Sequence, residues 1–383
     1  DEALALGALH AGLAGVFAYP GTPSTEITEY IQAHPITKER GLHCEWSSNE
    51  KTAMESALGM SYSGKRALVC MKHVGMNVCA DAFVNSAITG ANGGLVVVAC
   101  DDPSQHSSQN EQDSRFYADF AMVPCFEPSS QQEAYDMVRK AFEYSETRHI
   151  PVLMRLTTRM AHSRAVVTAG DILPENKLHF PEPGRAANWV TLPANAKRRV
   201  RQLADEIIMF GNDSEMSEDN VLATGKDSSM GIIACGIAYN YLMESFHGDC
   251  PYPVLKVTRY PFPKGLARHL ASGCRRIIVM EEGQPLIEER LRGLFYDKDN
   301  AAVSISGRLD GTLPRTGELT PDSVRKALGM APAESYESSH VVVPRPPALC
   351  QGCGHRDFYT ALNVVLERYA PQARVFSDIG CYT

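Results

Sequence analysis

Residues 49–99 read NEKTAMESALGMSYSGKRALVCMKHVGMNVCADAFVNSAITGANGGLVVVA, and this stretch alternates helical patterns with short apolar runs. Residues 49–63 predict a helix, because apolar side chains recur there at close to 3.6-residue spacing: Ala53, Met54, Ala57, Leu58 and Met60. Residues 76–88 predict a second helix, and the runs 66–71 and 95–99 predict strands. Strands that alternate with helices are typical of a parallel sheet with helices on both faces.

The same alternation extends in both directions from this stretch. Residues 16–19 and 151–157 predict an earlier and a later strand. The sequence SQQE (130–133) is a capping box that predicts the start of a helix. Thr22 is placed to cap another helix, with Pro23 at its first position. We therefore predict an α/β domain built on a parallel sheet.

The rest of the chain changes character several times. We predict five segments: a parallel-sheet domain over 1–165, a linker containing a helix over 166–228, a second α/β domain over 229–330, a Pro- and Ser-rich linker over 331–347, and the truncated start of a third domain over 348–383. The second domain rests on four predicted strands: 231–235, 254–257, 275–280 and 303–306. The last segment predicts a helix over 358–366 and a strand over 373–377.

Composition excludes several classes of protein. The chain has 383 residues, 44% hydrophobic and 21% charged, which excludes a mainly disordered chain. Its 45 acidic and 37 basic residues give a net charge of −8, the opposite of what a dedicated nucleic-acid binder usually carries. No apolar run approaches the roughly 18 residues that a membrane-spanning helix needs. No Gly-x-Gly-x-x-Gly follows a predicted strand, so a nicotinamide dehydrogenase has no support.

The 11 cysteines mostly stand alone rather than forming a disulfide framework. Cys70, Cys100 and Cys235 end apolar runs, so we expect small buried side chains in a reducing compartment. Together with a start at Asp1 that lacks a signal-peptide pattern, this predicts a cytoplasmic protein.

One basic run, Lys197, Arg198, Arg199 and Arg201, interrupts the predicted linker. It is compatible with contact to an anion or to RNA. We interpret it as the solvated face of a helix, because no aromatic residues are interleaved with it.

Four polar segments stand out, 19–24, 45–50, 72–75 and 106–113, and three of them lie in loops after the ends of strands. In open α/β sheets, ligands bind at the carboxyl ends of the strands, so we expect these segments to form one polar rim. Each alone has an ordinary interpretation. Glu50 taken alone is an acid that matches a helix N-terminus, and His73 and His106 taken alone are surface polar residues.

The rim carries motifs of a known family. The segment NEKTAMESALG (49–59) resembles the Asn-Glu-x-x-Ala helix of thiamine diphosphate enzymes, in which the Glu contacts the aminopyrimidine of the cofactor. Six further motifs resemble the α subunits of indolepyruvate:ferredoxin oxidoreductases: YPGTPSTE (19–26), MKHVGMN (71–77), DDPSQHSSQNEQD (101–113), MRLTTR (154–159), DGTLPRTGELTP (310–321) and CQGCGHR (350–356). They occur in the family's order over nearly the whole chain.

This resemblance implies a pyrimidine-binding domain of thiamine diphosphate-binding fold, then a transketolase C-terminal-like domain, then the start of a pyrophosphate-binding domain. The Gly-Asp-Gly…Asn motif that holds Mg²⁺ in the third domain is missing, and so is an eight-cysteine ferredoxin segment. The sequence therefore looks like the N-terminal three-fifths of a longer subunit.

The function that the resemblance implies is thiamine diphosphate-dependent oxidative decarboxylation of arylpyruvates, such as indolepyruvate and phenylpyruvate, with coenzyme A as acyl acceptor and ferredoxin as electron acceptor. Mg²⁺ and [4Fe–4S] clusters are the further cofactors. The implied partner is a smaller β subunit, in a heterotetramer of two α and two β chains, without nucleic acid or membrane.

The resemblance also implies roles for individual residues. Glu50 is the expected catalytic residue and contacts the cofactor, together with His73, Gly75, Gly380 and Cys381. The expected substrate-binding residues are Thr22, Ser24, His106, Ser107, Gln109 and Asn110. Cys350, Cys353 and Cys381 are the expected ligands of a [4Fe–4S] cluster, because thiolates suit iron–sulfur clusters; a zinc site or a redox pair is the alternative.

Two other functions stay open at this point. A non-oxidative thiamine diphosphate-dependent 2-oxo acid decarboxylase would need the rim but not the cysteines. A non-catalytic scaffold subunit would keep the fold without binding the cofactor.

Overall fold

The computed structural model describes residues 1–295, 303–334, 337–343 and 348–376. The chain divides into two compact units: residues 1–105 with 109–333, and residues 106–108 with 334–383. Each unit is described by itself.

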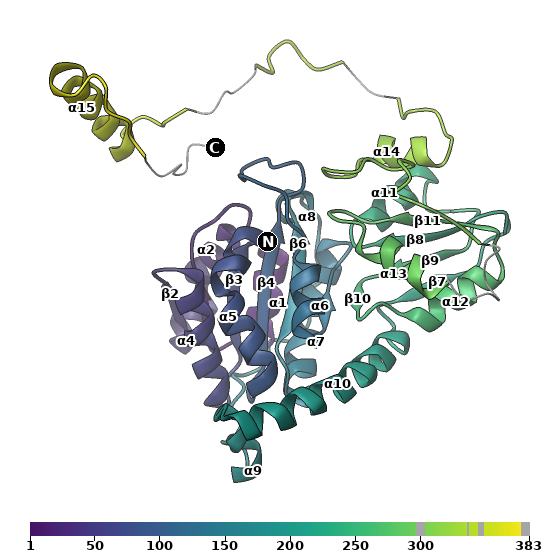
Figure 1. Cartoon of the computed structure of the whole chain (residues 1–383), viewed down its shortest axis with the longest axis horizontal. Helices are drawn as coiled ribbons and strands as arrows, with labels where there is room; N and C mark the ends of the chain where they lie inside the picture. Colours follow the sequence, from purple (N-terminus) through teal and green to yellow (C-terminus); the bar gives the residue numbers. More distant parts are fainter. Residues whose placement is uncertain (296–302, 335–336, 344–347, 377–383) are drawn as a thin grey trace. The chain divides into compact units, whose positions relative to one another are not determined.

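A seven-stranded sheet organises the first half of the larger unit (Figure 1). Its spatial order is β10-β5-β6-β4-β3-β1-β2, and neighbouring strands are parallel except for β10 and β5. The bounds are β1 Gly15–Ala18, β2 His43–Trp46, β3 Ala67–Lys72, β4 Leu95–Asp101, β5 Cys125–Phe126, β6 Val152–Thr157 and β10 Arg259–Tyr260. The central strands β4 and β6 are buried along their whole length, which explains why both begin as apolar runs in the sequence, although β6 also contains Arg155.

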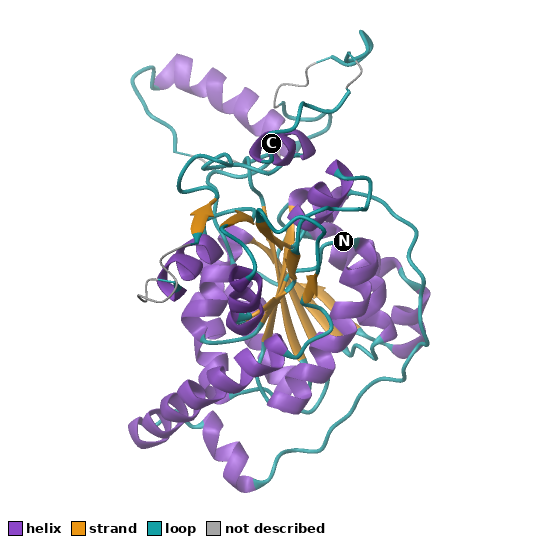
Figure 2. Ribbon diagram, turned by 90° about the vertical axis from the view of Figure 1, so that its right-hand side faces the viewer, coloured by secondary structure: helices purple, strands orange, loops and turns teal. Residues whose placement is uncertain are grey.

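Helices cover both faces of this sheet (Figure 2). They are α1 Glu2–His10, α2 Thr25–Ala33, α3 Pro35–Arg40, α4 Glu50–Tyr62, α5 His73–Thr89, α6 Arg115–Ala121, α7 Gln131–Arg148 and α8 Thr158–His162. Successive strand residues point to opposite faces: Val69 belongs to the core under α4 and α5, and Leu68 to the core under α1 and α7. The α/β fold class and the parallel sheet predicted from the sequence are confirmed.

Two predicted helix starts have different outcomes. The side chain of Ser130 accepts a hydrogen bond from the backbone of Glu133 and caps α7, as predicted, although the Glu133 carboxylate turns to the backbone N–H of Ser129. The prediction that Thr22 caps a helix is wrong, because α2 begins three residues later, after Ser24. The segment before it forms a turn, in which Ser24 donates to the carbonyl of Gly21.

A five-stranded sheet organises the second half of the larger unit, in the order β12-β11-β8-β9-β7. Its strands are β7 Val221–Ala223, β8 Gly231–Cys235, β9 Val254–Val257, β11 Arg276–Met280 and β12 Ser304–Ser306. Its helices are α11 Ala238–Ser245, α12 Lys264–Ser272, α13 Leu286–Leu294 and α14 Pro321–Ala327. Four of these strands were predicted from the sequence, and β7 is an additional antiparallel edge strand.

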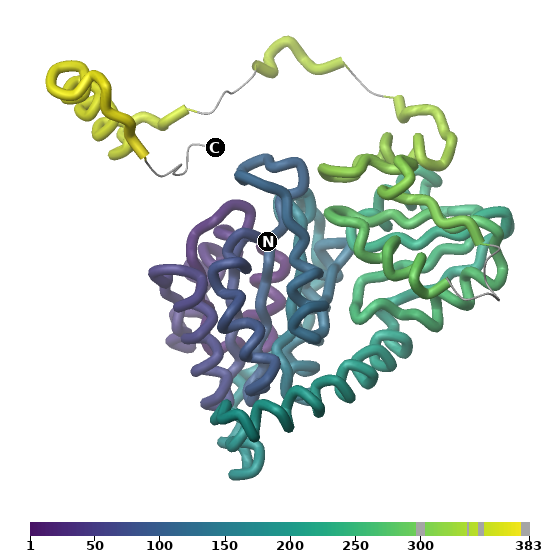
Figure 3. The backbone as a smooth tube through the Cα atoms, viewed as in Figure 1, coloured from purple at the N-terminus to yellow at the C-terminus, as the bar shows by residue number. Residues whose placement is uncertain are grey.

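The two halves are joined more closely than a linker implies. The segment between them forms α9 (Pro183–Ala186), the short 3₁₀ helix η1 (Ala187–Trp189) and the 23-residue α10 (Pro193–Glu215), which is the long teal helix in Figure 3. Strand β10 follows β9 in the chain but pairs with β5 of the first sheet. One backbone thus contributes to both sheets.

The smaller unit contains α15 (Gly354–Tyr369), which includes the predicted helix 358–366. Residues 373–376 form no strand, so the predicted strand 373–377 is wrong over the part that the structure describes. Gly380 and Cys381 lie outside the described residues.

Candidate functional site

Polar segments meet at the carboxyl edge of the first sheet. The strands β6, β4, β3, β1 and β2 are neighbours in that order and run parallel. Near their ends, Ala18 pairs with Trp46 and with Cys70, and Asp101 pairs with Thr157. The segments that follow these strands therefore start at one edge, as the sequence predicts.

Glu50 lies directly against Gly75. Glu50 is the first residue of α4, and Gly75 lies in the first turn of α5. A Cβ atom placed on Gly75 would stand 2.7 Å from both Cγ and Oε1 of Glu50, closer than real side chains pack. The missing side chain of Gly75 therefore makes the space in which the Glu50 carboxyl lies.

The environment of Glu50 is apolar and holds no cation within salt-bridge distance among the described residues. The residue is 8% exposed, and Ala53 and Met54 of the same helix are fully buried. Burial raises the pKa of the Glu50 carboxyl, with a smaller opposing effect from a backbone hydrogen bond. Asn49 fixes the start of the helix, because its side chain accepts a 2.9 Å hydrogen bond from the backbone of Thr52.

His73 begins α5 and is fully buried. Its Nε2 lies 3.1 Å from the carbonyl oxygen of Asn110, so Nε2 carries the proton and donates it. Its Nδ1 has no hydrogen-bond partner among the described residues and is then an unused acceptor. Buried polar atoms are normally paired, so this nitrogen marks a place for a ligand or a water molecule.

A second contact joins β3 to the turn after β1. A Cβ on Gly21 would stand 3.1 Å from Cδ of Lys72, so the aliphatic part of the lysine lies against this turn. Burial lowers the pKa of Lys72, and Asp102 acts in the opposite direction. Ser24 is 1% exposed and donates to Gly21, whereas Thr22 is exposed.

The predicted substrate-binding residues fall in two units. Gln109 and Asn110 are exposed in the larger unit, and Asn110 contacts His73. His106 and Ser107 belong to the smaller unit, so their role stays a prediction.

Sequence reasoning missed what anchors the segment between β4 and α6. Arg155 donates to Asp101 at 2.5 Å and lies 3.6 Å from Asp113, so one buried guanidinium holds both ends of the segment. Within the same segment, the Glu111 carboxylate accepts a hydrogen bond from the backbone N–H of Gly317 at 2.8 Å. Gly317 belongs to the DGTLPRTGELTP motif (310–321), so this hydrogen bond ties the motif to the segment between β4 and α6.

The anchor belongs to a buried ion network between the two halves. Arg115 pairs with Asp113 at 2.5 Å and with Glu281 at 2.9 Å, and all three side chains are at most 1% exposed. Burial tends to raise the pKa of Asp113, but Arg115 and Arg155 outweigh it and lower that pKa to about 2. In the sequence these residues appear only as isolated charges beside apolar runs, so no local pattern indicates that they form a network.

The predicted cluster ligands are partly described. Cys350 is exposed, and Cys353 is half-buried with its Sγ 3.9 Å from Nδ1 of His355. Cys381 lies outside the described residues. Within the described ranges, no group of three His, Cys, Asp or Glu side chains is arranged to hold a metal ion.

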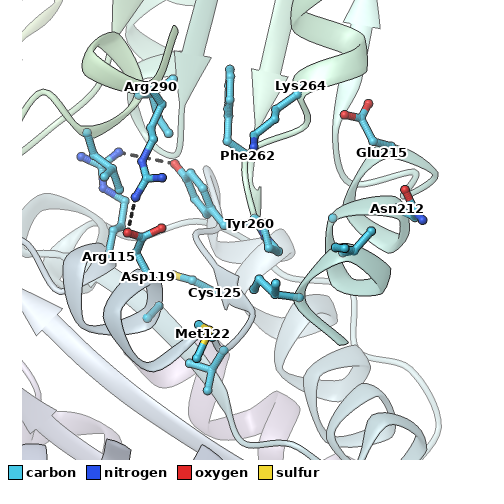
Figure 4. Close-up of a pocket in the computed structure, with 18 of the residues that line it drawn as sticks. Arg115, Asp119, Met122, Cys125, Asn212, Glu215, Tyr260, Phe262, Lys264 and Arg290 are labelled. Carbon is cyan, nitrogen blue, oxygen red and sulfur yellow. Dashed lines mark hydrogen bonds and ion pairs between the residues drawn. The ribbon is translucent and has the colours of Figure 1, made fainter. Parts of the chain in front are cut away.

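A cavity of about 770 Å³ lies at the seam between the halves, away from Glu50 (Figure 4). Helices α6, α10 and α13 and the segment 260–268 line it. Arg290 pairs with Asp119 at its rim, and Arg115 contributes one wall. Neither Glu50 nor His73 lines this cavity.

In the described part of the chain, no helix is both long and apolar enough to cross a membrane.

Known proteins resemble this chain over its whole length. The family described as pyruvate flavodoxin/ferredoxin oxidoreductase, thiamine diphosphate-binding, matches residues 6–198. The indolepyruvate oxidoreductase subunit IorA of Methanothermobacter thermautotrophicus is 40% identical over 100% of this chain and 63% of its own length. The subunit of the same name from Pyrococcus abyssi is 39% identical over 100% of this chain and 61% of its own length. The resemblance inferred from the motifs is confirmed, and the chain spans only about three-fifths of these curated relatives.

A solved structure shows the same fold at low identity. It is the 2-oxoglutarate:ferredoxin oxidoreductase from Magnetococcus marinus, with a TM-score of 0.65 and 15% sequence identity over 86% of this chain and 64% of that chain.

Proposed function

The chain belongs to the pyruvate flavodoxin/ferredoxin oxidoreductase, thiamine diphosphate-binding family, and from this membership we propose that it forms part of the α subunit of an arylpyruvate:ferredoxin oxidoreductase. The single observation that carries the proposal is the Glu50 carboxyl held against Gly75 in an apolar surround. The name of the curated relatives, indolepyruvate oxidoreductase, supports indolepyruvate and related arylpyruvates as substrates.

The residues at the rim fit the aminopyrimidine end of thiamine diphosphate. A pyrimidine ring needs a proton-sharing carboxyl at one edge and hydrogen-bonding groups around it. Glu50 supplies the carboxyl, Gly75 leaves the space in which that carboxyl lies, and Nδ1 of His73, which has no partner among the described residues, supplies an acceptor. We propose that these three residues hold the ring, and that Gly380 and Cys381 contribute from outside the described residues.

Thiamine diphosphate, when bound, supplies the electron sink for loss of CO₂ from a 2-oxo acid. The chain's own contribution is to place one proton. Because its pKa is raised, the Glu50 carboxyl holds a proton closer to neutral pH than an exposed glutamate and is able to share it with a ring nitrogen. The buried surround of α4 excludes water from that proton.

The substrate side is proposed to be formed by Thr22, Gln109 and Asn110, with His106 and Ser107. Thr22, Gln109 and Asn110 are exposed at the same sheet edge as Glu50, where a carboxylate and a ketone would need hydrogen bonds. Ser24 has its hydroxyl engaged with Gly21, so we propose that it shapes the turn that presents Thr22.

The remaining cofactors and partners are also proposals, and their binding requires groups beyond the described residues. Mg²⁺ has no fitting group of ligands in the described ranges, and of the predicted ligands of a [4Fe–4S] cluster only Cys350 and Cys353, two of the four thiolates, lie among the described residues. We propose that both groups are completed outside the described residues. A smaller β subunit, ferredoxin and coenzyme A are the proposed partners, in a cytoplasmic heterotetramer of two α and two β chains. The limits of the domains over 1–165 and 229–330 likewise stay proposals.

The test is Glu50→Gln in the complete enzyme, with Glu55→Gln as its control. Glu55 lies on the same helix, but its side chain is 56% exposed and pairs only loosely with Lys51 at 3.9 Å. Gln keeps the shape of Glu50 but does not exchange a proton, so we expect arylpyruvate oxidation to fall by more than about a hundredfold. Glu55→Gln should leave turnover within about twofold of wild type. Equal turnover in both variants would contradict the proposal.

The same preparation separates the two other functions. A non-oxidative decarboxylase would release CO₂ without reducing ferredoxin, and its rate would not change when iron is removed. A scaffold subunit would show no thermal shift with thiamine diphosphate in the complete enzyme.

A further inference from the structure

A small basic cavity lies at the amino edge of the first sheet, the edge opposite Glu50. Its volume is about 240 Å³. The lining comes from the turn before β4, the end of α7, the segment 181–189 and the first half of α10. Four of its lining residues are arginines: Arg148, Arg185, Arg198 and Arg199. Glu206 is the only carboxylate among the lining residues.

Two of the arginines are already neutralised by the protein. Arg199 is 7% exposed, donates to the carbonyl of Ile88 at 2.9 Å and lies 3.3 Å from Glu206. Arg148 pairs with Asp213 at 2.6 Å. Arg148 is the last residue of α7, and the guanidinium of Arg199 lies at the C-terminus of α5, where a cation also matches the helix dipole. These two need no ligand to explain them.

The other two have only neutral partners among the described residues. Arg185 donates to Oδ1 of Asn92 at 2.8 Å, and its other terminal nitrogen lies 2.9 and 2.6 Å from the ring nitrogens of His149. Arg198 donates to Asn188 at 2.7 Å and to Gln202 at 3.2 Å. Two guanidinium groups thus face one small cavity without a carboxylate of their own.

The surrounding structure holds these groups in place. Trp189 stacks on Tyr62 of α4 with 4.3 Å between ring centroids, which fixes the segment that carries Arg185. Asn92 is 1% exposed and also donates to the carbonyl of His179 at 3.0 Å. The interpretation of the basic run as a solvated helix face is wrong for Arg199, which is buried, and is confirmed for Lys197, Arg198 and Arg201, which are exposed on α10.

We propose that this cavity binds a phosphate group. Planar guanidinium groups match the paired oxygens of a phosphate, and two guanidinium groups that face one cavity without a carboxylate partner, the half-buried Arg185 and the exposed Arg198, favour a multivalent anion over chloride. The volume is below the roughly 300 to 1,000 Å³ of drug-sized ligand sites, so the occupant is inorganic phosphate or the phosphate end of a small ester. The site lies at the opposite sheet edge from Glu50 and does not depend on the proposed function.

The test is isothermal titration of the full chain with inorganic phosphate and, separately, with glycerol 3-phosphate, at constant ionic strength set with chloride. We expect binding of at least one of the two, weakened at least about tenfold by Arg198→Gln and by Arg185→Gln. Arg201→Gln is the matched control, since it removes the same charge from the same helix but lies outside the cavity and is exposed. It should change the affinity by less than about twofold.

The two titrants distinguish the sources of the phosphate group. Binding of both indicates a site for free phosphate, and binding of the ester alone indicates a phosphorylated metabolite. No heat with either titrant up to about 10 mM, or equal weakening by Arg201→Gln and Arg198→Gln, would overturn the proposal. Arg198 is exposed, so its variant should keep the wild-type circular dichroism spectrum and gives a result even where Arg185→Gln fails to fold.

Discussion

Both sheets of the larger unit are mainly parallel and place a buried acid just beyond the carboxyl end of a strand, but the two acids have different partners. Glu50 follows β2 and lies against Gly75 without a cation. Glu281 directly follows β11, lies 2.9 Å from Arg115 and accepts from the backbone N–H groups of Ile287 and Glu288. Burial raises the pKa of both carboxyls, so burial alone does not distinguish them.

The two carboxyls differ in the partners that the protein provides for them. The protein itself satisfies Glu281, which makes that acid part of the joint between the halves. Glu50 has a backbone hydrogen bond but no cation partner among the described residues, as expected of a group that meets a ligand. Glu281 therefore holds the two halves of the unit together, whereas Glu50, at a similar position in the other sheet, is the proposed catalytic acid.

Breaking the joint should give the largest effect. Arg115→Met leaves Glu281 as an uncompensated buried charge and leaves Asp113 with only the more distant Arg155, so we expect a loss of about 3 to 5 kcal/mol in the free energy of unfolding. Urea unfolding of the purified protein measures it. The control is Arg290→Met, which breaks an exposed pair with Asp119 and should cost less than about 1 kcal/mol. Similar small losses in both variants would contradict a structural role for the network.

Filling the space beside Glu50 should come next. Gly75→Ala puts a methyl group 2.7 Å from Cγ and Oε1 of Glu50, and the side chain that must move is the glutamate itself. We therefore expect the fold to survive and turnover to fall by about a hundredfold, as for a misplaced reacting group. Gly59→Ala on α4 is the control, since nothing lies within 4 Å of its added Cβ. Steady-state kinetics of both variants measure the effect. Unchanged turnover in Gly75→Ala would show that the position of Glu50 is unimportant.

Acid should weaken the joint. The folded-state pKa of Asp113 is lowered from 3.8 to about 2, so its contribution to stability is present above its unfolded pKa and is lost as pH falls through the folded value. We expect the stability difference between wild type and Asp113→Asn to narrow between about pH 4 and pH 2. Urea midpoints across that range measure it. A difference that stays constant with pH would mean that the carboxylate is not held ionised by Arg115.

Helix caps offer the smallest and most selective comparison. Asn49→Ala and Ser130→Ala each remove one N-cap acceptor, from α4 and α7 respectively, and each should cost about 1 kcal/mol of stability. Only the first cap precedes Glu50, so only Asn49→Ala should also lower turnover. Thermal unfolding and kinetics on the same samples separate the two effects. Loss of turnover in both variants would point to general destabilisation instead.

The elements with a strong local pattern were predictable. The strands β4 and β8 are short, fully buried and mainly apolar runs that the sequence reveals directly, and the motif around Glu50 pointed to the helix that carries it. The length of α10 was not foreseen, because its polar surface resembles a linker. Strand β10 has two residues and exists only through its pairing with β5, which no local pattern encodes.

The site was predictable to a similar degree. The nearness of Glu50 to Gly75 follows from the parallel order of the strands. Other contacts join positions that lie far apart in the chain. Arg155 pairs with Asp101 and Asp113, and Glu111 accepts a hydrogen bond from Gly317. Such pairs depend on tertiary packing, so isolated charges in a sequence do not disclose them.

The central claim is that thiamine diphosphate meets the Glu50 carboxyl, and infrared difference spectroscopy tests it most directly. The carboxyl stretch of Glu50 is identified by subtracting the spectrum of Glu50→Gln from that of the wild type in the complete enzyme. We predict that adding thiamine diphosphate shifts this band in the wild type and that no corresponding change appears in Glu50→Gln. A bound cofactor that leaves the band unchanged would contradict the account.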